Sequence, residues 1–178
     1  DITLNGVLSA LGGSGATDGT DGTVTLNADG AVDEGAADAL TDIAAGTLYI
    51  VSNTGVGATN TLDTEVTTID VLNQVSGNIQ IIEVAAGGDL DVQEATQAGT
   101  SGSISLTTQR GDLTVLAPPG LNLGVRLTNG ANNGGTILLD ANVTAAGQEP
   151  GDGNVVVDNV VTSQGGTITV NADHDITG

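Results

Sequence analysis

The chain has 178 residues, including 28 glycines and a single tyrosine, and it contains no Phe, Trp, Met or Cys. The chain has two arginines, no lysine and 22 acidic residues, which gives a formal net charge of -20 at pH 7. This charge excludes nucleic acid as a partner and disfavours anionic membrane surfaces, because both need a cationic footprint on the protein. No apolar run approaches the ~20 residues of a membrane-spanning helix, so no membrane span is expected.

The residue inventory also limits the core. Without large aromatic side chains, the core must consist of Val, Ile, Leu and Ala, and β-branched residues favour strands. A thin core bounded by sheets fits this inventory. High net charge is also typical of disordered chains. However, 38% of the residues are hydrophobic and they alternate regularly with polar ones, which indicates a folded chain.

Short strands are predicted along the whole chain from triplets in which two apolar residues flank a polar or small one. In a strand, the outer two side chains point to one face and the middle one to the other, so one face is core and the other wet. Residues 33–44 are rich in Ala, but Gly35 interrupts them, so we expect a loop with at most one helical turn there. The predicted strands are centred on residues 2–4, 24–26, 48–50, 69–71, 79–81, 90–92, 104–106, 113–115, 121–123, 125–127, 137–139, 155–157 and 168–170.

Two octapeptides are nearly identical. Residues 22–29 read Gly-Thr-Val-Thr-Leu-Asn-Ala-Asp, residues 166–173 read Gly-Thr-Ile-Thr-Val-Asn-Ala-Asp, and residues 135–140 are a looser copy. A glycine, a strand triplet and a polar turn recur about every 10 residues or in multiples of that spacing, which predicts stacked coils of roughly 20–30 residues.

Two all-β architectures compete for this pattern. A β-sandwich of antiparallel sheets usually needs an aromatic or disulfide anchor, and the chain has neither. A parallel β-helix, or β-solenoid, needs only ladders of Val, Ile and Leu stacked coil on coil. We therefore expect residues 1–178 to form a single β-solenoid segment with irregular coils, with the sandwich as the alternative.

The repeats resemble those of filamentous-haemagglutinin-like giant bacterial surface proteins. The resemblance lies in residues 46–66, with their Thr-Gly-Val-Gly and Leu-Asp-Thr-Glu-Val combinations, and in the Gly-x-Ile or Gly-x-Leu strands at 77–81, 102–106, 111–115 and 166–170. It covers most of the chain from Gly22 onward. It implies a right-handed parallel β-helix, export to the cell surface or beyond, and an adhesive or structural role.

Metal-binding candidates are acidic. Asp18, Asp21, Asp29 and Asp33 lie in one loop-rich stretch, and calcium binds several carboxylate and carbonyl oxygens. The alternative is that these are solubilising turn residues, since Asp is common in turns. His174 lies between two aspartates and could hold a transition metal, but an exposed turn histidine is the favoured interpretation.

No catalytic residue and no organic cofactor is assigned, because the chain has no nucleophile motif, phosphate loop or cofactor fingerprint. Paired carboxylates could serve a polysaccharide-active β-helix. Sugar-binding clefts usually add aromatic and basic partners, whereas this chain offers one Tyr and two isolated Arg. We therefore expect a protein that is not an enzyme.

The predicted function is a structural or adhesive surface repeat that forms a rigid fibre or stalk; the alternative is a self-assembling filament or surface-layer subunit joined by strand addition. The chain starts at Asp1, which indicates a processed chain or an excerpt of a longer one. The expected partners are copies of itself or adjacent repeats, head-to-tail, together with host or matrix glycans. At such a junction, Ile2 and Leu4 of one unit would meet Ile168 and Val170 of the next.

Overall fold

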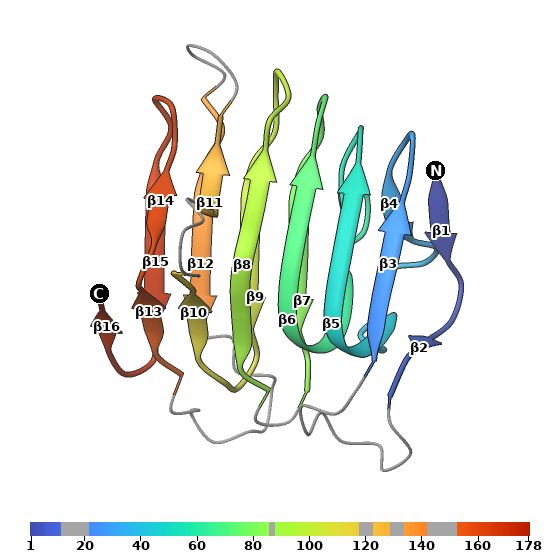
Figure 1. The fold of residues 1–178 in the computed structure, drawn as a ribbon, viewed down its shortest axis with the longest axis horizontal. Coiled ribbons are helices and arrows are strands. Elements are labelled where there is room, and N and C mark those ends of the chain that lie inside the picture. Colours follow the sequence, from blue (N-terminus) through green and yellow to red (C-terminus); the bar gives the residue numbers. More distant parts are fainter. Residues whose placement is uncertain (12–21, 86–87, 118–122, 129–133, 142–152) are drawn as a thin grey trace.

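The structure is a computed structural model that describes residues 1–11, 22–85, 88–117, 123–128, 134–141 and 153–178. Within these residues the chain is all-β, with sixteen strands and no helix. The strands lie side by side along the long axis of the molecule, and the N- and C-termini lie at opposite ends of it (Figure 1). Every strand pairing is parallel, so the described residues do not form the antiparallel sandwich that was the alternative.

The strands form three rows, which we call A, B and C. Row A contains β3 (Thr23–Asn27), the later parts of β5 (Ile43–Ser52), β6 (Leu62–Asn73) and β8 (Leu90–Gln97), then β11 (Gly124–Leu127) and β14 (Val160–Thr162). Row B contains β1 (Ile2–Leu4), β4 (Val32–Glu34), β7 (Ile79–Glu83), β9 (Ile104–Thr108), β12 (Ile137–Ala141) and β15 (Ile168–Ala172). Row C contains β2 (Leu8–Ser9), the first parts of β5 and β8 with the adjoining part of β6, then β10 (Leu113–Val115), β13 (Val155–Val157) and β16 (Ile176–Thr177). Residues 62–64, at the start of β6, also pair with β7 of row B.

One column of apolar residues runs through row B from end to end. Single bridges join Val32 to Val56 and Val56 to Ile79, and continuous ladders complete the column, which reads Ile2, Val32, Val56, Ile79, Ile104, Ile137, Ile168. Partners are 23 residues apart in the Val56–Ile79 bridge and 33 apart in the Ile104–Ile137 pair. The length of chain in a layer therefore varies, which agrees with the irregular coils predicted from the sequence.

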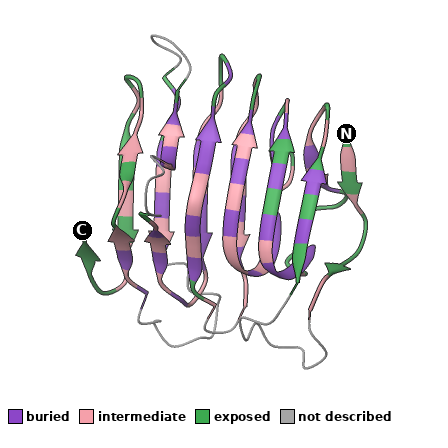
Figure 2. Cartoon of the chain, in the orientation of Figure 1, coloured by how far each residue is buried: buried purple, intermediate pink, exposed green. Residues whose placement is uncertain are grey.

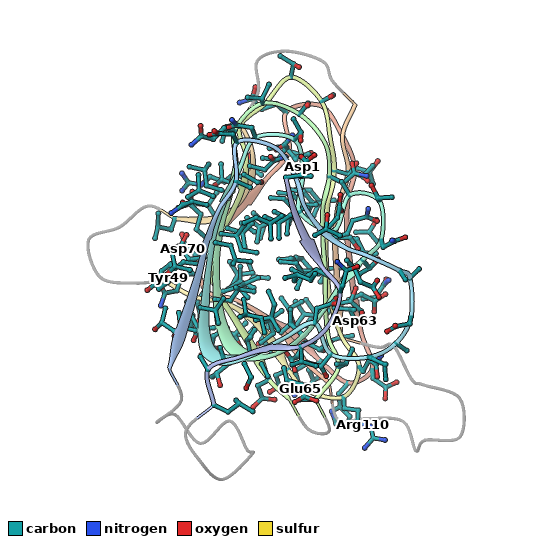
Figure 3. All side chains as sticks on the ribbon, turned by 90° about the vertical axis from the view of Figure 1, so that its right-hand side faces the viewer. Asp1, Tyr49, Asp63, Glu65, Asp70 and Arg110 are labelled. Atoms are coloured by element: carbon teal, nitrogen blue, oxygen red, sulfur yellow. The ribbon has the colours of Figure 1, made fainter. Side chains whose placement is uncertain are left out.

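The core lies between the rows. Seen end-on, the strands surround a filling of short aliphatic side chains, while acidic and amide side chains point outward (Figure 3). Burial is greatest in the middle strands and lowest at the two ends of the stack (Figure 2). Ile79, Leu106 and Leu139 are among the fully buried residues. The predicted alternation of core and wet faces is thus confirmed, as in β3 and β7.

A column of glycines precedes row B. A Cβ atom on Gly102 would collide with the carbonyl oxygen of Gly77, one on Gly135 with that of Gly102, and one on Gly166 with that of Gly135. Gly77 and Gly102 also have positive φ angles of 87° and 132°. The recurrent glycine before each triplet therefore reflects close stacking of successive turns.

Residues 33–44 contain the end of β4, bends and the start of β5, and no helical turn. The loop predicted from Gly35 for these residues is therefore only partly correct, because β4 extends to Glu34 and β5 begins at Ile43. The octapeptide at 22–29 supplies β3 in row A, whereas its near-copy at 166–173 supplies β15 in row B. The repeat therefore marks a strand and its turn, and not one whole layer.

Candidate functional site

The four residues predicted to form an end-to-end contact lie at opposite ends of one row. Ile2 and Leu4 belong to β1, the first strand of row B, and Ile168 and Val170 belong to β15, its last strand. Ile2 and Ile168 are the two ends of the column described above. Four of the column's inner members are completely buried, whereas Ile168 is 40% exposed.

Other edge strands are exposed in the same way. At the C-terminal end of the stack, Val160 of β14 is 41% exposed and Ile176 of β16 is 58% exposed. At the N-terminal end, Val7 and Leu8 are exposed beside β1. Among the described residues, the last strand of each row thus has a backbone edge with no partner strand, and exposed apolar side chains lie on β2 at one end and on β14, β15 and β16 at the other.

The predicted calcium residues are only partly described. Asp18 and Asp21 lie outside the described residues. Both oxygens of the Asp33 carboxylate accept hydrogen bonds from Thr59, one from the backbone N–H at 3.0 Å and one from the hydroxyl at 3.2 Å. Asp29 lines a surface hollow, and its carbonyl accepts a hydrogen bond from Asn53. Asp33 thus has a bracing role between layers, and calcium binding by these residues remains a prediction.

A second acidic group was not predicted from the sequence. Glu34, Asp38 and Asp42 line a pocket of about 200 Å³ beside Leu4 and Leu40, and Asp63 lies next to Asp42 in the ladder. The Asp42 carboxylate accepts the backbone N–H of Asp63 at 3.0 Å, and that of Glu34 accepts the N–H of Asp38 at 3.0 Å. Asp42 and Asp63 are 21 positions apart in sequence, and no local pattern links them.

Burial and like charge act together on this group. Burial, followed by the charges of Asp42, Glu34 and Asp38, raises the pKa of Asp63 to about 6. The pKa of Asp42 is also raised, chiefly by burial. Across the described residues, no three or more His, Cys, Asp or Glu side chains are placed together so that they could hold a metal ion.

Glu83 is a fully buried acid at the end of β7. One carboxylate oxygen accepts the Val66 N–H at 2.7 Å and the Thr64 hydroxyl at 3.1 Å, and the other accepts the Ala85 N–H at 3.0 Å. Desolvation outweighs these donors and raises its pKa to about 7. The side chain therefore ties β7 to β6, the strand with which it pairs, and is closed off from solvent.

His174 lies in the turn between β15 and β16. Its Nδ1 atom is 3.9 Å from an Asp175 carboxylate oxygen, and both side chains are well exposed. The backbone N–H groups of Asp173 and His174 both donate to the Gly153 carbonyl. This placement agrees with an exposed turn histidine.

The outer face of row A carries the chain's single aromatic residue. Tyr49 points away from the core, on the same side of the molecule as Asp70 (Figure 3). Tyr49 and Val51, two residues on along the same face of β5, are each 37% exposed. Beside Val51 lies a hollow of about 280 Å³, lined also by Asn27, Ala28, Asp29, Asn53 and Gln74. No sequence pattern predicts this hollow, because its residues come from three layers.

Comparison of the chain with protein-family models, with curated proteins and with solved structures found no match in any of the three. In the part of the chain that the structure describes, no helix is long and apolar enough to cross a membrane.

Proposed function

We propose that this chain is a segment of a right-handed parallel β-helix that acts outside the cell as a rigid structural or adhesive fibre or stalk. The observation that carries the proposal is the row B column from Ile2 to Ile168, which is buried in the middle and open at both ends. Parallel pairing between residues one layer apart is the arrangement expected of stacked coils. The resemblance to filamentous-haemagglutinin-like repeats supports export and adhesion.

A fibre requires that the stack continue beyond each end. Another layer placed on β1 or β15 would pair the open backbone groups and cover the exposed apolar side chains. That layer is an adjacent repeat of the same polypeptide or the opposite end of a second copy. In either case Ile2 and Leu4 stack on residues equivalent to Ile168 and Val170, and the contact is heterologous, so it propagates and does not close.

The alternative is a filament or surface-layer subunit that assembles by strand addition. The unpaired edge strands at both ends favour this alternative, because the last strand of each row in one copy could pair with the first strand of the same row in a second copy. The mass of the native polypeptide distinguishes a repeat segment from a subunit. A longer polypeptide with tandem copies on both sides identifies a repeat segment, and a mature chain of 178 residues identifies a subunit.

The test is assembly of the 178-residue chain at rising concentration, followed by sedimentation velocity and electron microscopy. We expect head-to-tail oligomers, and we expect Ile2→Lys with Ile168→Lys to abolish them by placing charge in the junction. The matched control is Thr3→Lys with Thr169→Lys, which adds the same charge to the same strands at exposed, outward-facing positions. A chain that stays monomeric, or equal loss of assembly in both double variants, would contradict the proposal.

A further inference from the structure

The hollow beside Val51 deepens the adhesive part of the proposed function, on which this inference rests. We propose that the outer face of row A, formed by Tyr49, Val51 and the hollow lined by Asn27, Asp29, Asn53 and Gln74, binds a neutral saccharide. We call these six residues the amide hollow.

The apolar part of the amide hollow comes from one strand. Tyr49 and Val51 lie two residues apart on the same face of β5, which places them about 6–7 Å apart along the strand. They are each 37% exposed, in a chain whose other large apolar residues on these middle strands are mostly buried. A tyrosine ring offers a flat apolar surface with a polar hydroxyl, a combination enriched where proteins bind partners.

The polar part comes from the neighbouring layers. Asn27 pairs with Val51 in the ladder between β3 and β5, and Gln74 directly follows β6, the strand on the other side. The Asn53 side-chain amide donates to the Asp29 carbonyl at 3.1 Å, which fixes the turn that closes the hollow. The lining is therefore assembled from three successive layers and held by the backbone.

These side chains have unused hydrogen-bonding capacity. Among the described residues, the side-chain amides of Asn27 and Gln74 have no hydrogen-bond partner, and neither has the Asp29 carboxylate. Each amide offers two donors and an acceptor, and the carboxylate offers acceptors alone. The set can therefore bind adjacent groups that both donate and accept, and sugar hydroxyls have this property.

Charge and shape narrow the ligand class. The net charge of -20 repels sialylated, uronic or sulfated glycans. Asp29 lines the hollow, and Asp70 is the ladder partner of Tyr49. A phosphate or nucleotide is disfavoured for the same reason. A neutral pyranose presents hydroxyls at its edge and an apolar C–H face, which match the amides and the Tyr49–Val51 surface respectively. The volume of about 280 Å³ admits one sugar unit, with the rest of a glycan lying over the exposed face.

The experiment measures binding of the 178-residue chain to a glycan array containing both neutral and sialylated or sulfated oligosaccharides, followed by calorimetric titration with the strongest neutral ligand. We expect binding confined to neutral glycans. We expect Asn27→Ala or Gln74→Ala to weaken it about tenfold, and Tyr49→Ala to weaken it by at least as much. Gln164→Ala, which removes an exposed amide at a distant turn, is the matched control and should leave binding unchanged.

Absence of neutral glycans among the bound ligands, stronger binding of the charged glycans, or binding unaffected by the three substitutions would overturn the inference. Thermal unfolding of each variant accompanies the titrations, so that a folding defect is distinguished from a lost contact. The measurement uses single chains, so it succeeds or fails separately from head-to-tail assembly. It is repeated on the Ile2→Lys, Ile168→Lys variant, in which the amide hollow is intact.

Discussion

Glu83 shows how this chain handles a buried charge. It is fully enclosed, yet all three of its hydrogen-bond partners are donors, so the ionised form is satisfied although it is desolvated. Desolvation prevails, and the pKa stands at about 7 in the folded chain against 4.5 for an unperturbed glutamate. Asp42, Asp63, Asp70 and Asp91 have pKa values raised in the same direction, each chiefly by burial.

These shifts predict an unusual pH dependence. Between pH 4.5 and about 7 the folded chain holds a proton on Glu83 that the unfolded chain has lost, so the free energy of unfolding falls as pH rises through this window. Asp63 adds to the fall between pH 3.8 and about 6. We expect the melting temperature to be higher at pH 4.5 than at pH 7, which differs from the usual loss of stability in acid.

Calorimetry across this pH range checks the prediction. Glu83→Gln removes the titrating group, and although it also disturbs the donors around it, the slope between pH 4.5 and 7 should become shallower. Asp63→Asn should reduce the slope mainly below pH 6. A melting temperature that rises steadily from pH 4.5 to 7 in the unaltered chain would show that other groups dominate.

At the scale of elements, the turns before row B depend on the glycine column. Gly102 has a φ of 132°, and a Cβ there would collide with the carbonyl of Gly77 in the layer below. Side chains help to hold the same turns: the Asn73 amide donates to the carbonyls of Ser76 and Gly77, and the Ser163 hydroxyl donates to that of Gly166. The register of row B is thus set at the turns as well as by the core.

Alanine substitutions at glycines distinguish the cost of a strained backbone from the cost of a steric clash between an added Cβ atom and the neighbouring layer. Gly134 also has a positive φ, of 66°, but nothing lies within 4 Å of the place a Cβ would take. Gly134→Ala should therefore cost only the strain of a left-handed backbone, of order 1–3 kcal/mol, and Gly102→Ala should cost clearly more. Gly6→Ala, with open space and no positive φ, should have little effect. Chemical denaturation measures all three, and equal losses for Gly102→Ala and Gly134→Ala would show that the stacked turns can move apart.

At the scale of the whole molecule, the acidic charge opposes compaction. The chain carries a net charge of -20, and four of its acids, Glu34, Asp38, Asp42 and Asp63, lie close together near the N-terminal end of the stack. A divalent cation lowers this repulsion more effectively than a monovalent one when it lies between carboxylates.

We therefore expect calcium chloride to raise the melting temperature more than sodium chloride of the same ionic strength. If the predicted loop residues hold the ion, Asp29→Asn with Asp33→Asn should remove the excess; Asn at position 33 keeps an acceptor for Thr59. Differential scanning fluorimetry gives the comparison. Equal shifts from the two salts would indicate general screening and no specific site.

Much of the strand content followed from the sequence alone. Triplets such as 79–81 and 104–106 alternate apolar and polar residues, and a period of two specifies a half-buried strand wherever it occurs. The prediction that nucleic acid is not a partner rests on the net charge, and no observation on the structure tests it. The expectation of ladders of small aliphatic residues followed from the missing aromatic residues. The strand pattern depends only on residues that are close together in the sequence, and charge and composition need no structure at all, so these features could be predicted from the sequence.

Tertiary structure decided which strands become neighbours. The near-identical octapeptides at 22–29 and 166–173 lie in different rows, because what places a strand in a row is its register with the layer before it. The Asp42–Asp63 contact and the amide hollow likewise join residues one layer apart, with separations that vary from layer to layer. The number of residues in a layer depends on insertions between the strands, and the triplets do not encode the size of these insertions. The local sequence therefore predicted the strands. Only the stacking of layers brought the residues of the candidate sites together.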